Sequence, residues 1–278
     1  MKIAFWSPIH GQAGTTSNIL ITALMTGLVF RKRTLLTQTH FNFNNLEAPL
    51  VDYNPKNNAS ADYYLDVGLD SLIRSFKAAR LDKASLENCC IAFPDTNVTL
   101  LPGTTKSNKD SFEAEMGAVI INLLRSIEEL YSVVFIDVSP GDNPLSLKII
   151  EDSELVVVNL SQNIAITQIY FNLYGDRLKS RAFYLFGDYD RNSKYNLGNL
   201  RRRFSKDITV LNSGVIPYNP AFHDSQCDTR TIDFLQKNLN CSKDDENYYF
   251  IMKSLKAVTK LLKCAGMDIR SEEGCNKQ

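Results

Sequence analysis

The segment from Ser7 to Ser17 carries the residues best suited to chemistry. It reads Ser-Pro-Ile-His-Gly-Gln-Ala-Gly-Thr-Thr-Ser and lies between an apolar run that ends at Trp6 and a helical pattern that begins at Thr15. The backbone N–H groups of such a turn, together with the N-terminus of the next helix, can hold phosphate groups. Taken alone, the segment also fits a purely structural turn, with glycine for positive φ and hydroxyl residues for capping.

The segment departs from the common phosphate-loop pattern Gly-x-x-x-x-Gly-Lys-[Ser/Thr]. Ile9 stands at the leading glycine and Thr15 stands at the lysine. In that pattern the lysine reaches the terminal phosphates, and the hydroxyl residue after it binds magnesium. The motif by itself is therefore weak, and taken alone it favours a structural turn over a phosphate site.

The elements around this segment alternate between short apolar runs and longer helical patterns, which predicts βαβ units. The predicted strands are Lys2 to Ser7, Thr34 to Gln38, Val98 to Leu101, Val133 to Val138, Leu155 to Leu160, Ala182 to Phe186 and Ile208 to Ile216. The predicted helices are Thr15 to Phe30, Leu69 to Arg80, Ser111 to Leu130, Leu145 to Asp152 and Tyr195 to Arg203. Several strands are apolar on both faces, as buried strands between helix layers must be. The sequence predicts a three-layer α/β fold with a mostly parallel, twisted sheet flanked by helices.

No interdomain linker or repeat interrupts this pattern. We expect residues 1–265 to form one domain and residues 266–278 to form a polar C-terminal tail. The segment from Phe41 to Ala61 is rich in Asn and Pro and is expected to form a long loop after the second strand. Loops at the carboxyl ends of such strands line ligand sites.

Composition and charge restrict the classes of protein that fit. The chain has 278 residues, of which 44% are apolar and 22% are charged, with 31 Lys and Arg against 31 Asp and Glu. The balanced charge creates no general attraction to nucleic acid or an anionic membrane. The first residues are too short for a signal peptide, and no apolar run approaches the ~18 residues of a membrane span. We expect a cytoplasmic protein.

Over nearly its full length the chain resembles the ParA/MinD family of P-loop ATPases, whose loop reads Lys-Gly-Gly-x-Gly-Lys-Thr-[Ser/Thr]. On that template His10 stands at the signature lysine, Gln12 replaces a glycine, Thr15 replaces the phosphate-binding lysine and Thr16 matches the magnesium-binding hydroxyl. In the family the signature lysine reaches across a nucleotide-sandwich dimer. The nucleotide-binding residues that the resemblance implies are His10, Gly11, Gln12, Ala13, Gly14, Thr15, Thr16, Ser17 and, from the late strand near adenine, Pro217.

Two further motifs of the family can be compared with this sequence. Family members carry Asp-x-Asp-x-x-Gln near the end of the second strand, where this chain has Gln38 and His40. The segment from Tyr131 to Gly141 resembles the Walker B strand and places Asp137 at the acid of the metal's outer coordination shell. The resemblance therefore implies Thr16 and Asp137 as magnesium residues and gives no firm catalytic residue.

The missing charges bear on the expected activity. Phosphoryl-transfer sites act by positioning and charge stabilisation, and loss of one donor typically costs ~2.7 to 4 kcal/mol of transition-state stabilisation. Main-chain N–H groups and the helix dipole still favour phosphate. We expect ATP and magnesium as cofactors that bind weakly, with slow hydrolysis or none.

Within the family the layout resembles the TadZ/CpaE branch, adaptor proteins that localise Flp-type pilus machinery. The matching segments are Asp66 to Leu72, Arg80 to Asp82 and Val98 to Thr104. The resemblance implies a homodimer formed through the P-loop face, with ATP as a switch and a pilus, secretion or partition protein as partner. Two alternatives stay open, namely a nucleotide-independent scaffold (a pseudo-ATPase) and a partition-type ATPase that binds DNA non-specifically.

Two basic groups could form binding surfaces. Arg201, Arg202, Arg203 and Lys206 form the densest cluster and could contact DNA phosphates, although the solvated end of a helix is the favoured interpretation. Four lysines share one face of the last helix, opposite an apolar face, as in a membrane-binding helix. A helix packed on the sheet with its lysines in water is favoured there. These four residues are Lys253, Lys256, Lys260 and Lys263.

Overall fold

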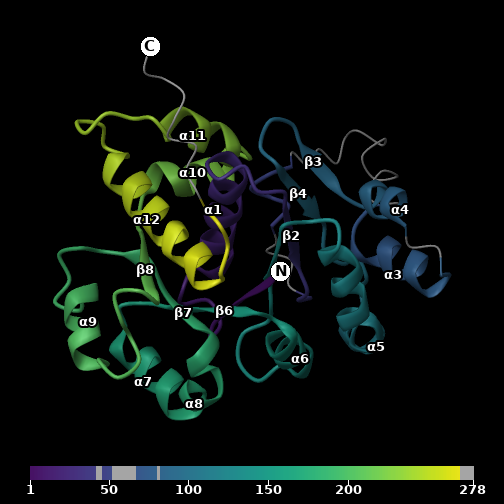
Figure 1. Ribbon diagram of the computed structural model, residues 1–278, viewed down its shortest axis with the longest axis horizontal. Helices are drawn as coiled ribbons and strands as arrows, with labels where there is room; N and C mark the ends of the chain where they lie inside the picture. The colour runs from purple at the N-terminus through teal and green to yellow at the C-terminus, as the bar shows by residue number, and fades with distance from the viewer. Residues whose placement is uncertain (42–45, 52–66, 80–81, 270–278) are drawn as a thin grey trace.

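The computed structural model describes residues 1–41, 46–51, 67–79 and 82–269, and this part of the chain is built on an eight-stranded sheet (Figure 1). The strand order is β3-β4-β2-β5-β1-β6-β7-β8, and only the β3–β4 pair is antiparallel. The strands are β1 Lys2–Trp6, β2 Thr34–Gln38, β3 Ile91–Phe93, β4 Val98–Leu101, β5 Val133–Asp137, β6 Leu155–Leu160, β7 Ala182–Tyr189 and β8 Ser213–Pro217. The mostly parallel sheet predicted from sequence is confirmed.

Helices cover both faces of the sheet and complete the predicted three-layer α/β architecture (Figure 1). One layer holds α1 Thr15–Leu28, α10 Pro220–Cys227, α11 Thr231–Asn238 and α12 Tyr248–Cys264. The other holds α3 Leu69–Lys77, α4 Lys83–Asn88, α5 Lys109–Glu128, α6 Pro144–Asp152, α7 Ile164–Leu173, α8 Gly175–Leu178 and α9 Leu197–Arg203. A short 3-10 turn, Lys179–Arg181, leads into β7. Both faces of the central strands are buried, which explains their continuous apolar runs.

The strand predicted from Ile208 to Ile216 was wrong at its start, because β8 begins at Ser213. Asn212 Oδ1 accepts hydrogen bonds from Thr209 N at 2.7 Å and Thr209 Oγ1 at 2.8 Å. These local bonds close a turn that competes with strand pairing. The apolar residues from Ile208 to Leu211 therefore belong to a turn before the strand.

The helix predicted from Leu69 to Arg80 ends earlier, at Lys77, since Ala79 adopts a left-handed φ of 53° that terminates it. Arg80 lies outside the described residues. Sequence reasoning also did not predict β3, α4, α7, α8, α10 and α11. Several of these helices are short and depend on side-chain caps, as where Asn219 Oδ1 accepts from Phe222 N at 2.7 Å.

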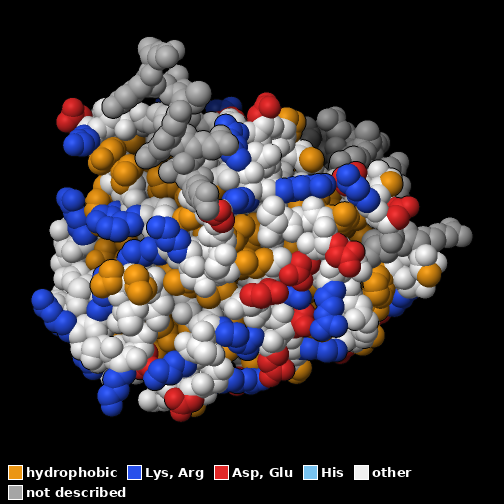
Figure 2. Space-filling model, viewed as in Figure 1, with side chains coloured by type: hydrophobic (Ala, Val, Ile, Leu, Met, Phe, Trp, Pro, Cys, Tyr) orange, Lys and Arg blue, Asp and Glu red, His pale blue; other side chains and the backbone are white. Residues whose placement is uncertain are grey.

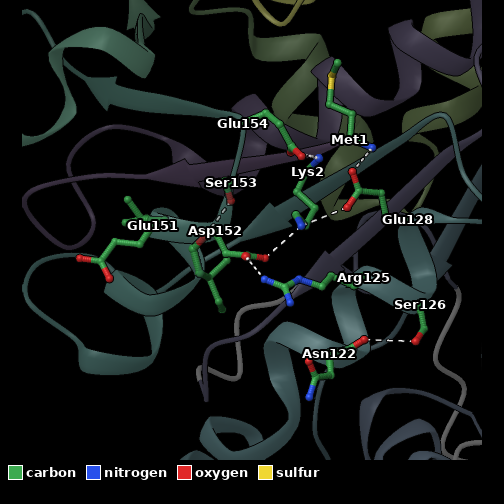
Figure 3. A network of polar contacts seen from close by, with 12 residues as sticks. Met1, Lys2, Asn122, Arg125, Ser126, Glu128, Glu151, Asp152, Ser153 and Glu154 are labelled. Atoms are coloured by element: carbon green, nitrogen blue, oxygen red, sulfur yellow. Dashed lines mark hydrogen bonds and ion pairs between the residues drawn. The ribbon is translucent and has the colours of Figure 1, made fainter.

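The N-terminal strand β1 is anchored at its first residue by a buried lysine (Figure 3). Lys2 Nζ lies 3.0 Å from Glu128 Oε2 on α5 and 2.9 Å from Asp152 Oδ2 on α6. Arg125 also reaches Asp152, at 3.0 Å, and the Lys2 backbone N–H donates to Glu154. These contacts fix the start of the strand whose other end leads into the Ser7 to Ser17 segment.

Two segments discussed above are only partly described. Of the loop expected from Phe41 to Ala61, residues 42–45 and 52–61 lie outside the described residues, as do 270–278 of the expected tail. Met267 and Ile269, at the start of that tail, pack against the layer formed by α1 and α12. Within the described ranges, no helix is both long and apolar enough to cross a membrane.

Candidate phosphate-binding site

A cavity of about 640 Å³ opens at the carboxyl ends of β1, β2 and β5. In the sheet, β1 lies between β5 and β6. The strands β2 to β5 lie on one side of β1 and the strands β6 to β8 lie on the other, so the strand order reverses at β1. Open α/β sheets bind ligands at such a reversal point. The Ser7 to Ser17 segment supplies most of the wall. The lining residues are Ser7, Ile9, His10, Gly11, Ala13, Gly14, Thr15, Thr16, Ser17, His40, Phe41, Asp137, Val138 and Pro140.

Two glycines shape the loop that follows β1. Gly11 has a φ of 72°, and Gly14, the residue that caps α1, has a φ of 59° and a ψ of 34°. Both angles lie in the left-handed region that glycine adopts at little cost. The resulting turn directs the N-terminus of α1 toward the cavity, where orphan backbone N–H groups and the helix dipole favour an anion.

A buried amide pair supports the loop from below. Asn18 Nδ2 donates to Ala13 O at 3.0 Å and to Asn159 Oδ1 at 2.9 Å, and Asn159 Nδ2 donates to Trp6 O at 3.2 Å. Strand β7 approaches this pair closely, because a Cβ at Gly187 would lie 2.5 Å from Ala13 O. The loop is thus held by β6 and β7 as well as by its own strand.

The oxygen ligands expected for magnesium meet inside the cavity. Thr16 Oγ1 donates a hydrogen bond to Asp137 Oδ2 at 3.0 Å, and Asp137 is 2% exposed. The buried His40 places Nε2 3.6 Å from the same carboxylate oxygen. A hydroxyl and a carboxylate are hard oxygen donors of the kind that magnesium prefers beside phosphates. The residues therefore fit a magnesium ion held with a nucleotide.

The charges of the cavity are unusual for a phosphate site. Its described lining contains no Lys or Arg, and its basic groups are the imidazoles of His10 and His40. A carboxylate approaches the loop from outside, since Asp188 Oδ2 lies 3.2 Å from the position of a Cβ on Gly14. Asp188 Oδ1 also lies 3.2 Å from His223 Nε2. A carboxylate thus lies beside the residue that caps α1, in a region where anion-binding loops usually carry a positive charge.

Most of the residues predicted to bind nucleotide come together here, and a few do not. Every residue from His10 to Ser17 except Gln12 lines the cavity, whereas Gln12 and Pro217 lie outside the lining. Gln38, at the family's first acidic position, is buried, and its Oε1 accepts from Leu46 N at 2.9 Å. Gln38 therefore holds the chain after β2, and His40 is the member of that pair that reaches the cavity.

Sequence reasoning missed Asn159 and Asp188, which shape the loop without lining the cavity. Asn159 is fully buried within the apolar run of β6, and a polar residue in such a run is a signal that could have been used. Asp188 and Gly14 are far apart in the chain, and no sequence pattern predicts that they lie close together.

The fold separates Arg201 from the rest of the Arg201 to Lys206 cluster and places it beside the lysines of α12. Arg201 turns away from Arg202 and Arg203, and its Nε donates to Ser213 Oγ on β8 at 3.0 Å. There it shares a second cavity with three of the α12 lysines. The apolar face of α12 packs on the sheet, as favoured from sequence, with Ile251, Val258 and Leu261 buried.

No family model matches the chain, and no curated protein matches its sequence. Solved structures do match. A ParA family ATPase from Chlorobium tepidum is 13% identical with a TM-score of 0.70, covering 93% of this chain and 98% of that one. The septum site-determining protein MinD from Pyrococcus horikoshii, complexed with Mg-ADP, is 16% identical with a TM-score of 0.64, covering 96% and 98%.

A third match is an ATP complex of McdA from Cyanothece, 14% identical with a TM-score of 0.60, covering 96% of this chain and 97% of that one. The strand order, the loop after β1 and the helix that follows it define a P-loop NTPase fold. In particular the chain has the fold of ParA and MinD.

Proposed function

We propose that this chain is a ParA/MinD-like positioning or assembly protein that binds ATP and magnesium weakly and hydrolyses ATP slowly or not at all. The observation that carries the proposal is the Thr16–Asp137 hydrogen bond inside a cavity whose described lining has no Lys or Arg. The pair keeps the oxygen groups that hold magnesium, while the cationic groups that stabilise a transferring phosphoryl group are missing.

The roles of the chain's own residues follow from their positions. Backbone N–H groups between Gly11 and Thr16 would hold the phosphates, and Thr16 with Asp137 would hold magnesium, which neutralises phosphate charge when bound. Thr15 can offer a hydroxyl hydrogen bond and no charge. His10 contributes positive charge only when it is protonated.

We further propose that nucleotide binding controls assembly of a homodimer through the P-loop face. The support is the exposed position of His10 and Gly11 at the rim of the cavity, together with the fold shared with ParA and MinD. By resemblance the partner would be a pilus, secretion or partition protein, with the TadZ/CpaE adaptors as the closest type.

Calorimetric titration with ATP and magnesium tests the proposal. A saturable heat in the native chain, lost in Asp137→Ala, is the expected result, with phosphate release at background in both proteins. Sedimentation with and without ATP and magnesium then measures whether the dimer depends on nucleotide. Melting curves of Asp137→Ala confirm that the variant is folded.

The absence of any heat or thermal shift at millimolar ATP would favour a nucleotide-independent scaffold. That alternative is supported by the carboxylate of Asp188, which lies 3.2 Å from the position of a Cβ on Gly14 and would disfavour an anion bound at this helix N-terminus. Phosphate release that depends on Asp137 would instead favour an active partition-type ATPase.

A further inference from the structure

A second cavity, of about 230 Å³, lies at the edge of the sheet beside β8. Helices α9 and α12 flank it, and strands β6 and β7 separate β8 from the strand that carries the phosphate-binding loop. Figure 2 shows Lys and Arg side chains gathered over α12 on this side of the molecule. The sequence divides these cations between two helices, and the fold unites them.

Four cations line this cavity, namely Arg201 from α9 and Lys253, Lys256 and Lys260 from α12. The lining contains no Asp or Glu, and within the described residues none of the four forms an ion pair. The nearby charge of Asp190 contributes to raising the pKa of Tyr249, but Asp190 is not among the residues that line the cavity. Cations gathered around a concave surface without an acid create a strong local attraction for anions.

Two of these cations already have a structural role. Arg201 Nη2 and Lys260 Nζ both lie 3.3 Å from Ser213 O, and Lys260 also donates to Val210 O at 2.7 Å. These contacts hold the turn before β8 and the first residue of that edge strand. Lys253 also has a local contact, since its Nζ lies 5.6 Å from the centroid of the Tyr249 ring. These contacts explain single side chains, but they leave the convergence of four cations on one cavity unexplained.

The four cations that line this cavity repel one another. Burial lowers the pKa of Lys260, and the nearby charges of Arg201, Lys256 and Lys253 lower it further. Burial also lowers the pKa of Arg201. An anion placed among these groups would remove the repulsion and stabilise each charged form.

The rest of the wall indicates what else the ligand carries. Rings of Tyr189 and Tyr249 line the cavity together with Leu197 and Val215. The Tyr249 ring is itself flanked by cations, with Arg191 5.0 Å from its centroid. The site therefore offers a multivalent positive charge beside an apolar and aromatic surface.

We propose that this cavity binds the phosphate group of a small phosphorylated molecule. A phosphate ester carries up to two charges and several acceptor oxygens, which suits several flexible ammonium groups and one guanidinium better than a single carboxylate would. The aromatic and apolar wall would contact the group that carries the phosphate. Free phosphate esters and phospholipid headgroups share this chemistry.

Titration with inorganic pyrophosphate tests the proposal in a matched pair of double variants. Lys253→Gln with Lys256→Gln removes two charges from the lining and leaves the Ser213 contacts intact. Lys206→Gln with Lys263→Gln removes two exposed charges outside the lining. Pyrophosphate affinity at this site should fall by about tenfold or more in the first variant and by less than about twofold in the second.

Lysine acetylation followed by mass spectrometry separates this site from the phosphate-binding loop. Pyrophosphate should protect Lys253, Lys256 and Lys260 and should leave Lys206 and Lys263 reactive. The part of the ATP and magnesium thermal shift that is lost in Asp137→Ala should be the same in both double variants, so failure here is distinguishable from failure of the nucleotide proposal. Equal loss of pyrophosphate binding in both variants, or no protection, would overturn the proposal.

Vesicles identify the source of the phosphate. Cosedimentation with phosphatidylcholine vesicles containing a phosphoinositide, dependent on Lys253 and Lys256, would support the phosphate site and assign a headgroup as its ligand. Protection by pyrophosphate without vesicle binding would support a free phosphate ester. Binding to duplex DNA alone, without protection by pyrophosphate, would overturn the proposal.

Discussion

Thr16 Oγ1 and Asp137 Oδ2 are joined by a 3.0 Å hydrogen bond across 121 residues of sequence. Thr16 lies in the first turn of α1, and Asp137 ends the neighbouring strand β5. Their meeting inside a cavity at the carboxyl edge of the sheet is what makes the Ser7 to Ser17 segment a site. The same cavity has a threonine where phosphate loops carry lysine, so its affinity for nucleotide should respond to changes of charge.

Thr15→Lys should strengthen ATP binding. Thr15 lines the cavity, and a lysine there would add a charge-assisted hydrogen bond worth ~1.5 to 3 kcal/mol, or about 10- to 150-fold in affinity. Calorimetric titration measures the change. Gln12→Lys, which adds the same charge outside the lining, is the control. An equal gain in both variants would show that Thr15 is not aimed at the phosphates.

Asp188→Asn should also strengthen ATP binding, because it removes the carboxylate that lies against Gly14 at the start of α1. Charge near a helix N-terminus contributes ~0.3 to 1 kcal/mol, so the gain is about two- to fivefold at low salt. Asparagine tolerates the φ of 45° found at this position. The gain should shrink as salt rises. Asp228→Asn, an exposed change beyond α10, should leave the affinity unaltered.

Gly187→Ala should destabilise the fold and weaken ATP binding together. A Cβ there would lie 2.5 Å from Ala13 O and 2.6 Å from Asn18 Nδ2, so the loop or its supporting amide must move. We expect a loss of about 1 to 3 kcal/mol in the free energy of unfolding. Gly117→Ala, on α5 with nothing within 4 Å of its Cβ, should be neutral or stabilising. Thermal melts measure both, and equal melting temperatures would contradict the close approach.

Lys2→Met should destabilise the protein at neutral pH by about 2 kcal/mol. Breaking a fully buried ion pair typically costs ~3 to 5 kcal/mol. The loss should be smaller here because Glu128 and Asp152, the partner carboxylates, keep contact with solvent. Urea denaturation measures the loss. Lys83→Met, which breaks an exposed pair with Glu87, should cost less than ~0.5 kcal/mol. A similar loss in both variants would show that burial of Lys2 adds nothing.

The same network predicts how stability depends on pH. Burial alone would raise the pKa of Asp152, but Lys2 and Arg125 outweigh it and hold that pKa below its usual value. Burial alone would also raise the pKa of Glu128. The Met1 ammonium and Lys2 outweigh this effect, so the pKa of Glu128 lies below its usual value.

A carboxyl whose folded pKa is lowered stabilises the fold above its unfolded pKa, about 4, and the contribution disappears as pH falls through the folded pKa. Between pH 6 and pH 3 the native chain should therefore lose more stability than Lys2→Met. Denaturation curves across this range measure the difference, and parallel pH profiles would contradict it.

The sequence by itself determined the architecture and the location of the main cavity. Runs such as Val133 to Ile136 are apolar on both faces, as expected of a strand buried between two helix layers, and the structure confirms that fold. The glycines and hydroxyl residues from His10 to Ser17 likewise predict a tight turn before a helix. These features depend on neighbours in the chain, so they can be read from it.

Contacts between distant segments were decided only by the tertiary structure. It directed Gln38 toward Leu46 and His40 toward Asp137, although only one residue separates them in the chain. It also brought Arg201 to the lysines of α12, where the sequence had shown two separate basic groups. Side-chain direction and charge proximity depend on how strands and helices pack across the sheet, and that packing is not encoded in any local pattern.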